Sequence, residues 1–431
     1  METWKERDLR KMLSTGGASI QWLFFMFANT VVVPVSVGAA FELSGAEIAM
    51  TLRSSLILTG IACVLQGIWG HRYPLMEGHS GLMWGLLLHI STSASALGMS
   101  YQEIGGGIAS GMLAAAVFTA AAGWAGWASH IRKIFTPMVM SVYLFLLSVQ
   151  LVFIFFSGMM KLTSSGQLDI AVSLYSVAIV LFVSALKIKG RGIISHFSIL
   201  IGIVVGWGLY MVLFSSEAAT SGGRADFHWF PLGAPNLEWG IVLTTFVAGV
   251  INMSNTIASV QAAGLLLKEP PSNDQMNRSF ALTGLFTGGA AFLGLVPYAP
   301  FTSSIGFLES TRMVERLPFI IGGVLFSLLG IIPAAGELFA TLPITVGSAV
   351  LFVAYLQLFG SALKSLDGTD FHSNTIFRIA APVLTGISIM MMDPEIFSSL
   401  PIYIQPLFTN GLIIGVLLSA VLERFVRWEE Q

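Results

Sequence analysis

Long apolar runs without a charged residue alternate with short polar segments over most of the chain. The runs at 104–131, 134–160, 192–216 and 239–267 contain no Asp, Glu, Lys or Arg. Each run exceeds the roughly 20 residues that a helix needs to cross the hydrocarbon core of a bilayer. The pattern therefore predicts an all-α polytopic membrane protein.

Basic residues orient these predicted spans. If the N-terminus lies inside, the segments on that side hold all but three of the 21 Lys and Arg residues, the exceptions being Arg53, Lys161 and Arg224. Cytoplasmic segments are the ones that collect Lys and Arg, so we expect both termini in the cytoplasm. The spans that satisfy this orientation number fourteen.

One segment is too short for two ordinary transmembrane helices. Arg278 and Arg312 are both expected inside, so the 34 residues from 279 to 312 must cross the bilayer twice. An outward helix leaves about 15 residues, which as continuous helix would reach only about 22 Å of a core roughly 30 Å thick. Four or five extended residues followed by about ten helical ones would reach about 31 Å. The return span is therefore expected to be broken.

The residues of this segment fit a break. Pro297 and Pro300 lack a backbone donor and disfavour helix in the residue before them. We predict an extended chain over 298–303, followed by a half-helix whose N-cap is Ser303 or Ser304. The alternative is a proline kink in an ordinary helix. Irregular backbone at this depth is tolerated only inside protein or along a cavity, so a break favours a binding site.

A second segment has the same composition. "YPLMEGHSGLMWGLLLHIS", residues 73–91, passes from proline through polar and Gly-rich residues into an apolar helix, and we expect extended backbone over 75–80. This break begins the third span from the inside, whereas the other begins the tenth span from the outside. Similar elements seven spans apart in opposite directions predict two inverted seven-span repeats, with the substrate site between them. The residues expected at the two half-helix starts are Ser80, Gly81, Ser303 and Ser304.

Three polar residues of the predicted eighth span share one helix face. Asn252 and Asn255 are three residues apart, and Asn252 and Thr256 are four apart. Amides at membrane depth face a partner or a cavity, which makes these side chains candidate substrate ligands. Hydrogen bonding between helices is the alternative.

Composition narrows the functional class. The chain is 55% hydrophobic and 10% charged, whereas soluble proteins are about 25% charged. A net charge of −2 gives no case for a nucleic-acid partner. We find no carboxylate cluster, HExxH-like motif, nucleophile–base pair or P-loop, so we expect neither an enzyme nor an ATP-driven pump, and no cofactor or metal. Cys63 is the single cysteine, so an intrachain disulfide is excluded. The charged N-terminus does not resemble a signal peptide.

Three stretches resemble one transporter family. "SSIGFLESTR", residues 303–312, follows the tenth-span signature of that family. It matches the signature at Gly306, Thr311 and Arg312. "IQWLFFMFANTVVVP", residues 20–34, is similar to the first span and includes Gln21, and "EGHSG" lies where the third span begins. The chain thus resembles the nucleobase–ascorbate transporter family, also called the nucleobase:cation symporter family two, which includes bacterial uracil and purine permeases.

The resemblance implies a fold and an activity. It implies a secondary active transporter for a purine- or pyrimidine-like base in a bacterial-type cell membrane, with Gln21 at the substrate site, a proton as coupling ion, and a homodimer as a further expectation. The expected segments are a cytoplasmic N-terminal segment 1–17, a core domain 18–131 and 239–336 (spans 1–4 and 8–11), and a gate domain 132–238 and 337–431 (spans 5–7 and 12–14) that ends in a cytoplasmic tail. An anion transporter of the same inverted-repeat fold is the alternative, because two facing helix N-termini attract negative charge.

The chain departs from the family at the positions tied to proton coupling. The family carries Glu in the eighth span, Asp or His four residues later, and Glu or Gln in the tenth span. The corresponding residues here are Asn252, Thr256 and Ser303. These side chains do not titrate in the physiological range, so we expect weaker proton coupling than in members that carry the Glu.

Glu77 and His79 are the remaining candidates for a coupling proton. Both side chains titrate, and both lie where the third span resumes as helix. Glu77 is five residues from Arg72, so an interfacial or ion-paired carboxylate is the alternative. His79 is either a substrate hydrogen-bond partner or a structural histidine, and the sequence leaves both open.

Overall fold

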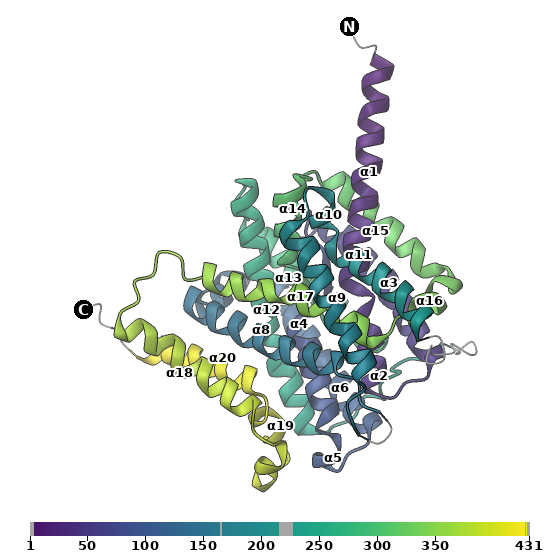
Figure 1. The fold of residues 1–431 in the computed structure, drawn as a ribbon. Helices are drawn as coiled ribbons and strands as arrows, with labels where there is room; N and C mark the ends of the chain where they lie inside the picture. The colour runs from purple at the N-terminus through teal and green to yellow at the C-terminus, as the bar shows by residue number, and fades with distance from the viewer. Residues whose placement is uncertain (1–3, 164–165, 215–226, 427, 429–431) are drawn as a thin grey trace.

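The chain folds into a body of packed helices (Figure 1). It also contains two short strands, all of whose residues are buried. The computed structural model describes residues 4–163, 166–214, 227–426 and 428. The elements of the first half are α1 (Trp4–Thr30), α2 (Val32–Ala40), α3 (Gly45–Ile68), β1 (Glu77–His79), α4 (Gly81–Thr92), α5 (Ala94–Leu97), α6 (Tyr101–Trp124), α7 (Ala128–Ile134), α8 (Pro137–Met159), α9 (Ile170–Lys189), α10 (Ile193–His196) and α11 (Ser198–Leu213). Those of the second half are α12 (Trp239–Leu267), α13 (Asn273–Phe292), β2 (Tyr298–Pro300), α14 (Ser303–Thr311), α15 (Arg316–Ile331), α16 (Pro333–Ala340), α17 (Ile344–Lys364), α18 (Ser373–Met390), the 3-10 helix η2 (Pro394–Ser399), α19 (Gln405–Phe408) and α20 (Gly411–Phe425).

Many of these helices suit a bilayer. Seven described spans are long and apolar enough to cross it: the α1–α2 stretch Thr15–Ala40, α3, α6, α8, α9, α12 and α17. The pair α15 and α16 is bent by 86° at its break, and α4 and α11 are shorter apolar helices. The predicted helical, many-span architecture is confirmed. The count of fourteen spans and the two inverted repeats stay predictions, because several expected spans correspond to short, bent or broken helices.

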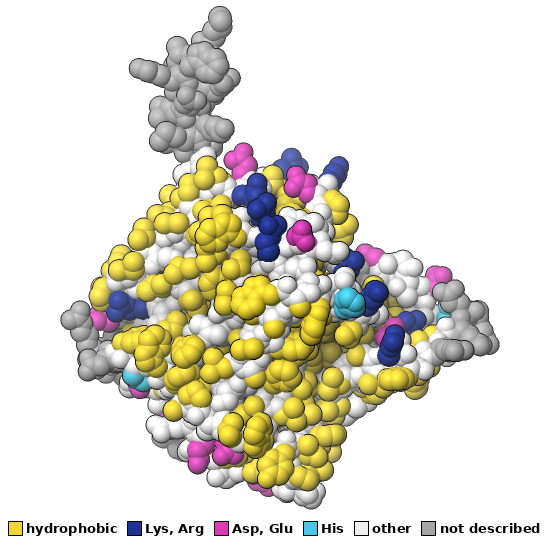
Figure 2. All heavy atoms as spheres, turned by 180° about the vertical axis from the view of Figure 1, so that it is seen from behind, with side chains coloured by type: hydrophobic (Ala, Val, Ile, Leu, Met, Phe, Trp, Pro, Cys, Tyr) yellow, Lys and Arg dark blue, Asp and Glu magenta, His cyan; other side chains and the backbone are white. Residues whose placement is uncertain are grey.

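Apolar side chains cover much of the outer surface. Figure 2 shows a broad area of hydrophobic side chains on one face, with Lys and Arg side chains gathered at the top and at the right of the view. Leu181 on α9 and Val212 on α11 are examples of large apolar side chains that lie exposed. Such an extended apolar surface suits contact with lipid rather than with water.

Small residues allow the helices to approach closely. An added Cβ at Gly284 of α13 would lie 2.5 Å from the backbone nitrogen of Ala120 on α6. At Gly123 of α6, it would lie 2.5 Å from the backbone nitrogen of Ala281 on α13. Only glycine fits at these two crossings, as is common where helices pack within a membrane.

Helix packing follows two groupings. The most extensive contacts of one group join α6 with α13 and α12, and α3 with α15. Those of the other join α17 with α8, and α18 with α20. The α18–α20 pair lies at the side of the body where the chain ends (Figure 1). The groups resemble the expected core and gate domains, whose boundaries remain predictions.

Candidate functional site

The two strands connect two broken stretches of helix. β1 and β2 pair antiparallel, with Glu77 opposite Pro300 and His79 opposite Tyr298. The backbone bond from Ser80 N to Pro297 O, 2.8 Å long, extends this ladder. The non-helical segment expected at 75–80 is thus confirmed. The one expected at 298–303 is shorter than predicted, because Thr302 has helical dihedral angles and Ser303 already belongs to α14. Because the pairing is antiparallel, α4 begins at one end of the ladder and α14 at the other.

The two helix starts are built differently. Ser80 is the N-cap of α4, and its hydroxyl accepts a bond from Met83 N. The N-cap of α14 is Thr302, whose side chain forms no capping bond within the described chain. The cap expected at Ser303 or Ser304 is therefore wrong. The reason is that the Ser304 hydroxyl accepts from Met76 N at 3.1 Å, and so serves the opposite strand segment instead of its own helix.

The side chain of Asn252 joins both strand segments to α12. Its Oδ1 accepts from Ser80 Oγ, and its Nδ2 donates to Tyr298 O at 3.0 Å. Asn252 is buried. The amide thus connects α12 with the start of α4 and with β2, in line with the alternative of hydrogen bonding between helices. One of its two N–H groups remains for another partner.

Asn255 extends this network to a second group of helices. Its Nδ2 donates to Asn252 Oδ1 at 3.0 Å, and its Oδ1 accepts from the hydroxyl of Tyr143 on α8, also at 3.0 Å. The start of α4 faces the same group, since a Cβ at Gly81 would lie 3.2 Å from Leu151 Cδ1. The same Cβ would lie 3.6 Å from the Tyr355 ring on α17. Asn255, which is only half-buried, and Gly81 therefore lie where the two helix groups meet.

Glu77 lies on the other face of β1. It is completely buried, and its Oε1 accepts from Thr283 Oγ1 on α13 at 2.6 Å. Within the described chain, Oε2 has no hydrogen-bond partner and the carboxyl group forms no ion pair. The carboxyl group thus lies inside the protein and does not pair with Arg72.

His79 faces the same side as Glu77, as alternate residues of a strand do. Its Nε2 lies 2.6 Å from Ser55 Oγ on α3, and its Nδ1 lies 3.1 Å from Val296 O. A carbonyl only accepts, so Nδ1 carries a proton, and in the neutral ring Nε2 accepts from the serine. A neutral imidazole satisfies both contacts, and both ring nitrogens are used inside the protein. This geometry favours the structural alternative for His79.

The remaining expected site residues are not joined to this network. Thr256 is completely buried, and its hydroxyl has no partner among the described residues. Gln21 lies half-buried on α1 and forms no hydrogen bond with the strands among the described residues, and Ser303 is exposed at the start of α14.

Sequence reasoning missed Tyr143, Thr283 and Gln66. The Gln66 amide on α3 donates to Thr283 Oγ1 at 3.1 Å, and so joins the contacts around Glu77. Gln66 carried the same signal that marked Asn252, namely an amide inside an apolar span. Nothing in the sequence distinguished Tyr143 or Thr283 from ordinary packing residues.

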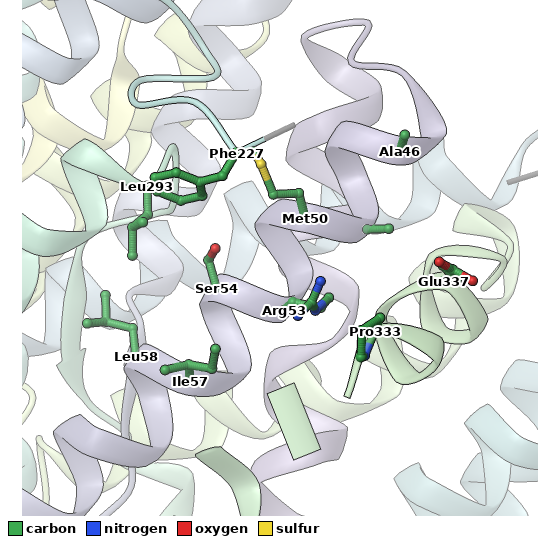
Figure 3. Close-up of a pocket in the computed structure, with 11 residues that line it drawn as sticks. Ala46, Met50, Arg53, Ser54, Ile57, Leu58, Phe227, Leu293, Pro333 and Glu337 are labelled. Atoms are coloured by element: carbon green, nitrogen blue, oxygen red, sulfur yellow. The ribbon is translucent and has the colours of Figure 1, made fainter. Parts of the chain in front are cut away.

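A separate cavity of about 390 Å³ lies between α3, α16 and two connecting segments (Figure 3). Arg53, Ser54, Phe227, Leu293 and Glu337 are among the residues that line it. The cavity shares no residue with the network around the strands.

A model of a permease family matches residues 14–395. The match covers most of the chain. The chain belongs to the nucleobase–ascorbate transporter family. The resemblance of its motifs is thereby confirmed, and the chain is an integral multi-pass membrane permease rather than an enzyme.

Curated relatives cover nearly the whole chain. The Bacillus subtilis protein YwdJ is 27% identical, over 96% of both chains. The nucleobase transporter PlUacP of Paenibacillus larvae is 24% identical over 96% of this chain and 94% of its own. The uric acid transporter UacT of Escherichia coli is 23% identical over 97% of this chain and 88% of its own.

Solved structures of two other transporters share the fold. The transmembrane domain of the cyanobacterial bicarbonate transporter BicA aligns with a TM-score of 0.62 at 14% identity, over 94% of this chain and 97% of that chain. The murine anion transporter Slc26a9 aligns with a TM-score of 0.63 at 11% identity, over 94% of this chain and 67% of that chain. At these identities, the likeness establishes the fold alone.

Proposed function

We propose that this permease is a secondary active transporter for a nucleobase of purine type. Family membership supports transport, and the names of the relatives PlUacP and UacT support the substrate class. The observation that carries the proposed site is the meeting of the start of α4 with Asn252 and Asn255 beside the paired strands. The base would bind at this point, between the two helix groups.

The chemistry of these groups suits a neutral planar base. Such a base presents alternating hydrogen-bond donors and acceptors along its edge. Ser80, Asn252 and Asn255 both donate and accept, and the first turn of α4 adds backbone N–H groups without partners in the helix. The aromatic rings of Tyr143 and Tyr355, which lie beside Asn255 and Gly81, would supply apolar contact area for a ring.

The same helix start also supports the alternative substrate, an anion. A helix N-terminus carries a partial positive charge and free N–H groups, which attract anions. None of the site residues that we propose is Lys or Arg. We therefore rank a neutral base above an anion.

Transport would proceed by movement of a core domain against a gate domain. The proposed core comprises 18–131 and 239–336, and the proposed gate comprises 132–238 and 337–431. The hydrogen bond between Tyr143 and Asn255 and the approach of Leu151 to Gly81 cross this proposed boundary. Fourteen spans in two inverted repeats, cytoplasmic termini and a bacterial-type cell membrane complete the proposal.

Uptake into proteoliposomes tests the substrate class. Labelled uracil, xanthine, hypoxanthine and urate would be offered separately, each with a tenfold excess of an unlabelled competitor from the same set. We expect uptake of a purine and competition by other purines. Uptake of bicarbonate or sulfate, with no uptake of any base, would instead establish the anion alternative.

A further inference from the structure

The buried carboxyl group of Glu77 lacks the partners that an ionised carboxylate needs. Within the described chain its Oε1 accepts from Thr283, the neutral Gln66 amide also bonds to the carboxyl group, and no positive side chain pairs with it. The titratable groups that face it are the Cys63 thiol on α3, the Tyr298 phenol on β2 and His79 on its own strand. The thiol and the phenol have no cationic form, and a neutral His79 ring satisfies both of its contacts. Burying a lone carboxylate is costly, whereas a protonated carboxyl group is neutral.

A short route connects Glu77 with the proposed substrate site. Thr283, its hydrogen-bond donor, also lines a small cavity between α6, α12 and α13. Asn252 and Thr287 line the same cavity, whose volume of about 10 Å³ is near the lower limit for one water molecule. Asn252 in turn accepts a bond from Ser80 at the start of α4. Hydroxyl and amide groups therefore extend from the carboxyl group to the proposed site, with space for one bridging water.

The backbone provides a second connection. Glu77 begins β1, and Ser80 caps α4 only three residues later. The N–H and C=O groups of Glu77 both bond to Cys63 Sγ, at 3.3 and 3.4 Å, which holds this end of the strand against α3. A change of charge at Glu77 would thus act on the same strand that positions the start of α4.

We propose that Glu77 is a proton-binding site of the transport cycle, connected through Thr283 and Asn252 to the substrate site. The proposal rests on the proposed transport function. A hydronium ion in the water at the substrate site supplies the proton: one of its O–H bonds breaks as an O–H bond forms at Oε2, which neutralises the carboxylate and leaves a water molecule. After the core has moved, this O–H bond breaks and the proton leaves to water on the other side. Because Glu77 acts without touching the base, its coupling is looser than that of a carboxylate at position 252.

Three variants in proteoliposomes test this proposal. Glu77→Gln keeps the shape and removes the proton-binding oxygen. Thr283→Val removes the hydroxyl, and Glu309→Gln is the control, since Glu309 is an exposed carboxylate on α14. Each is assayed for base exchange at equal pH on both sides, and for accumulation driven by an inward proton gradient.

We expect native accumulation to exceed exchange equilibrium severalfold and to vanish in Glu77→Gln, with exchange retained within about threefold. Thr283→Val should shift the pH at which uptake is half-maximal, whereas Glu309→Gln should behave like the native protein. Accumulation in Glu77→Gln equal to the native level would overturn the proposal. So would accumulation driven by a sodium gradient at constant pH.

Infrared difference spectroscopy provides a test that needs no transport by the variant. We expect the C=O band of a protonated carboxylic acid to change with pH in the native protein and to be absent in Glu77→Gln. An unchanged band in this variant would refute the assignment even if the variant transports poorly. If the native protein exchanges no base, the proposed function is refuted. If it exchanges base but a proton gradient does not drive accumulation, only this inference is refuted.

Discussion

The half-helices α4 and α14 occupy comparable positions at the two ends of one strand ladder, yet their starts differ. Ser80 caps α4, is buried and bonds to Asn252. Thr302 begins α14 without a capping bond within the described chain, and Ser303 beside it is exposed. Two segments of similar composition therefore have different surroundings. The start of α4 packs against α8 and α17, whereas the start of α14 is held by a hydrogen bond between Thr302 and Ser259 on α12. The first start is the better candidate for substrate contact.

The largest expected effect compares glycines of the two half-helices. At Gly81, an added Cβ would lie 3.2 Å from Leu151 Cδ1, so Gly81→Leu should fill the space between the helix groups. At Gly306, a Cβ would meet no atom within 4 Å. We expect transport to fall about tenfold or more in Gly81→Leu because of overpacking, and to change little in Gly306→Leu. The measurement is the rate of base uptake per amount of reconstituted protein. Equal losses of uptake in both variants would contradict the difference proposed between the starts of α4 and α14.

Asn252→Ala should have the next largest effect, because it removes the bonds to Ser80 and Tyr298 O. We expect base binding to weaken by roughly 1 to 3 kcal/mol, since buried partners are left unsatisfied. Thr256→Ala on the same face is the matched control, because its hydroxyl has no partner among the described residues. Equilibrium binding of labelled base measures both, and unchanged affinity in a folded Asn252→Ala protein would move the site away from α12.

Two adjacent serines at the start of α14 differ in burial: Ser304 is buried and Ser303 is exposed. Ser304→Ala should destabilise the fold by about 1 to 2 kcal/mol, because Met76 N loses its acceptor. The exposed Ser303 should tolerate the same change within about 0.5 kcal/mol. Thermal unfolding in detergent would rank the two variants, and the reverse ranking would contradict the hydrogen bond between Ser304 and the opposite strand segment.

The smallest effect concerns the contact between helix groups. Tyr143→Phe keeps the ring and removes the bond to Asn255, so base binding should change by about 0.5 to 1.5 kcal/mol. Tyr175→Phe is the control, because that hydroxyl donates to Gly206 O between α9 and α11. A double variant with Asn255→Ala should show less than the sum of the single effects. Additive effects would mean that the two side chains do not act together.

The sequence by itself determined the membrane class, the family and the two breaks. Charge-free runs longer than a bilayer crossing and the signature residues Gly306, Thr311 and Arg312 are local properties of the chain. The break near 298–303 also followed from local quantities, namely the span lengths that basic residues allow and the prolines between them. Asn252 was found because an amide inside an apolar span is costly without a partner.

Only the tertiary structure decided what each polar group binds. Glu77 and Ser80 are three residues apart, but they face opposite sides of β1, toward α13 and α12. Their partners are distant in sequence. Thr283 is 206 residues from Glu77, Ser304 is 228 residues from Met76, and Tyr298 is 46 residues from Asn252. Side-chain period and spacing specify which residues share a face, but not which distant helix covers that face. That choice depends on how closely the glycine-lined helices pack, and packing is a property of the folded chain as a whole.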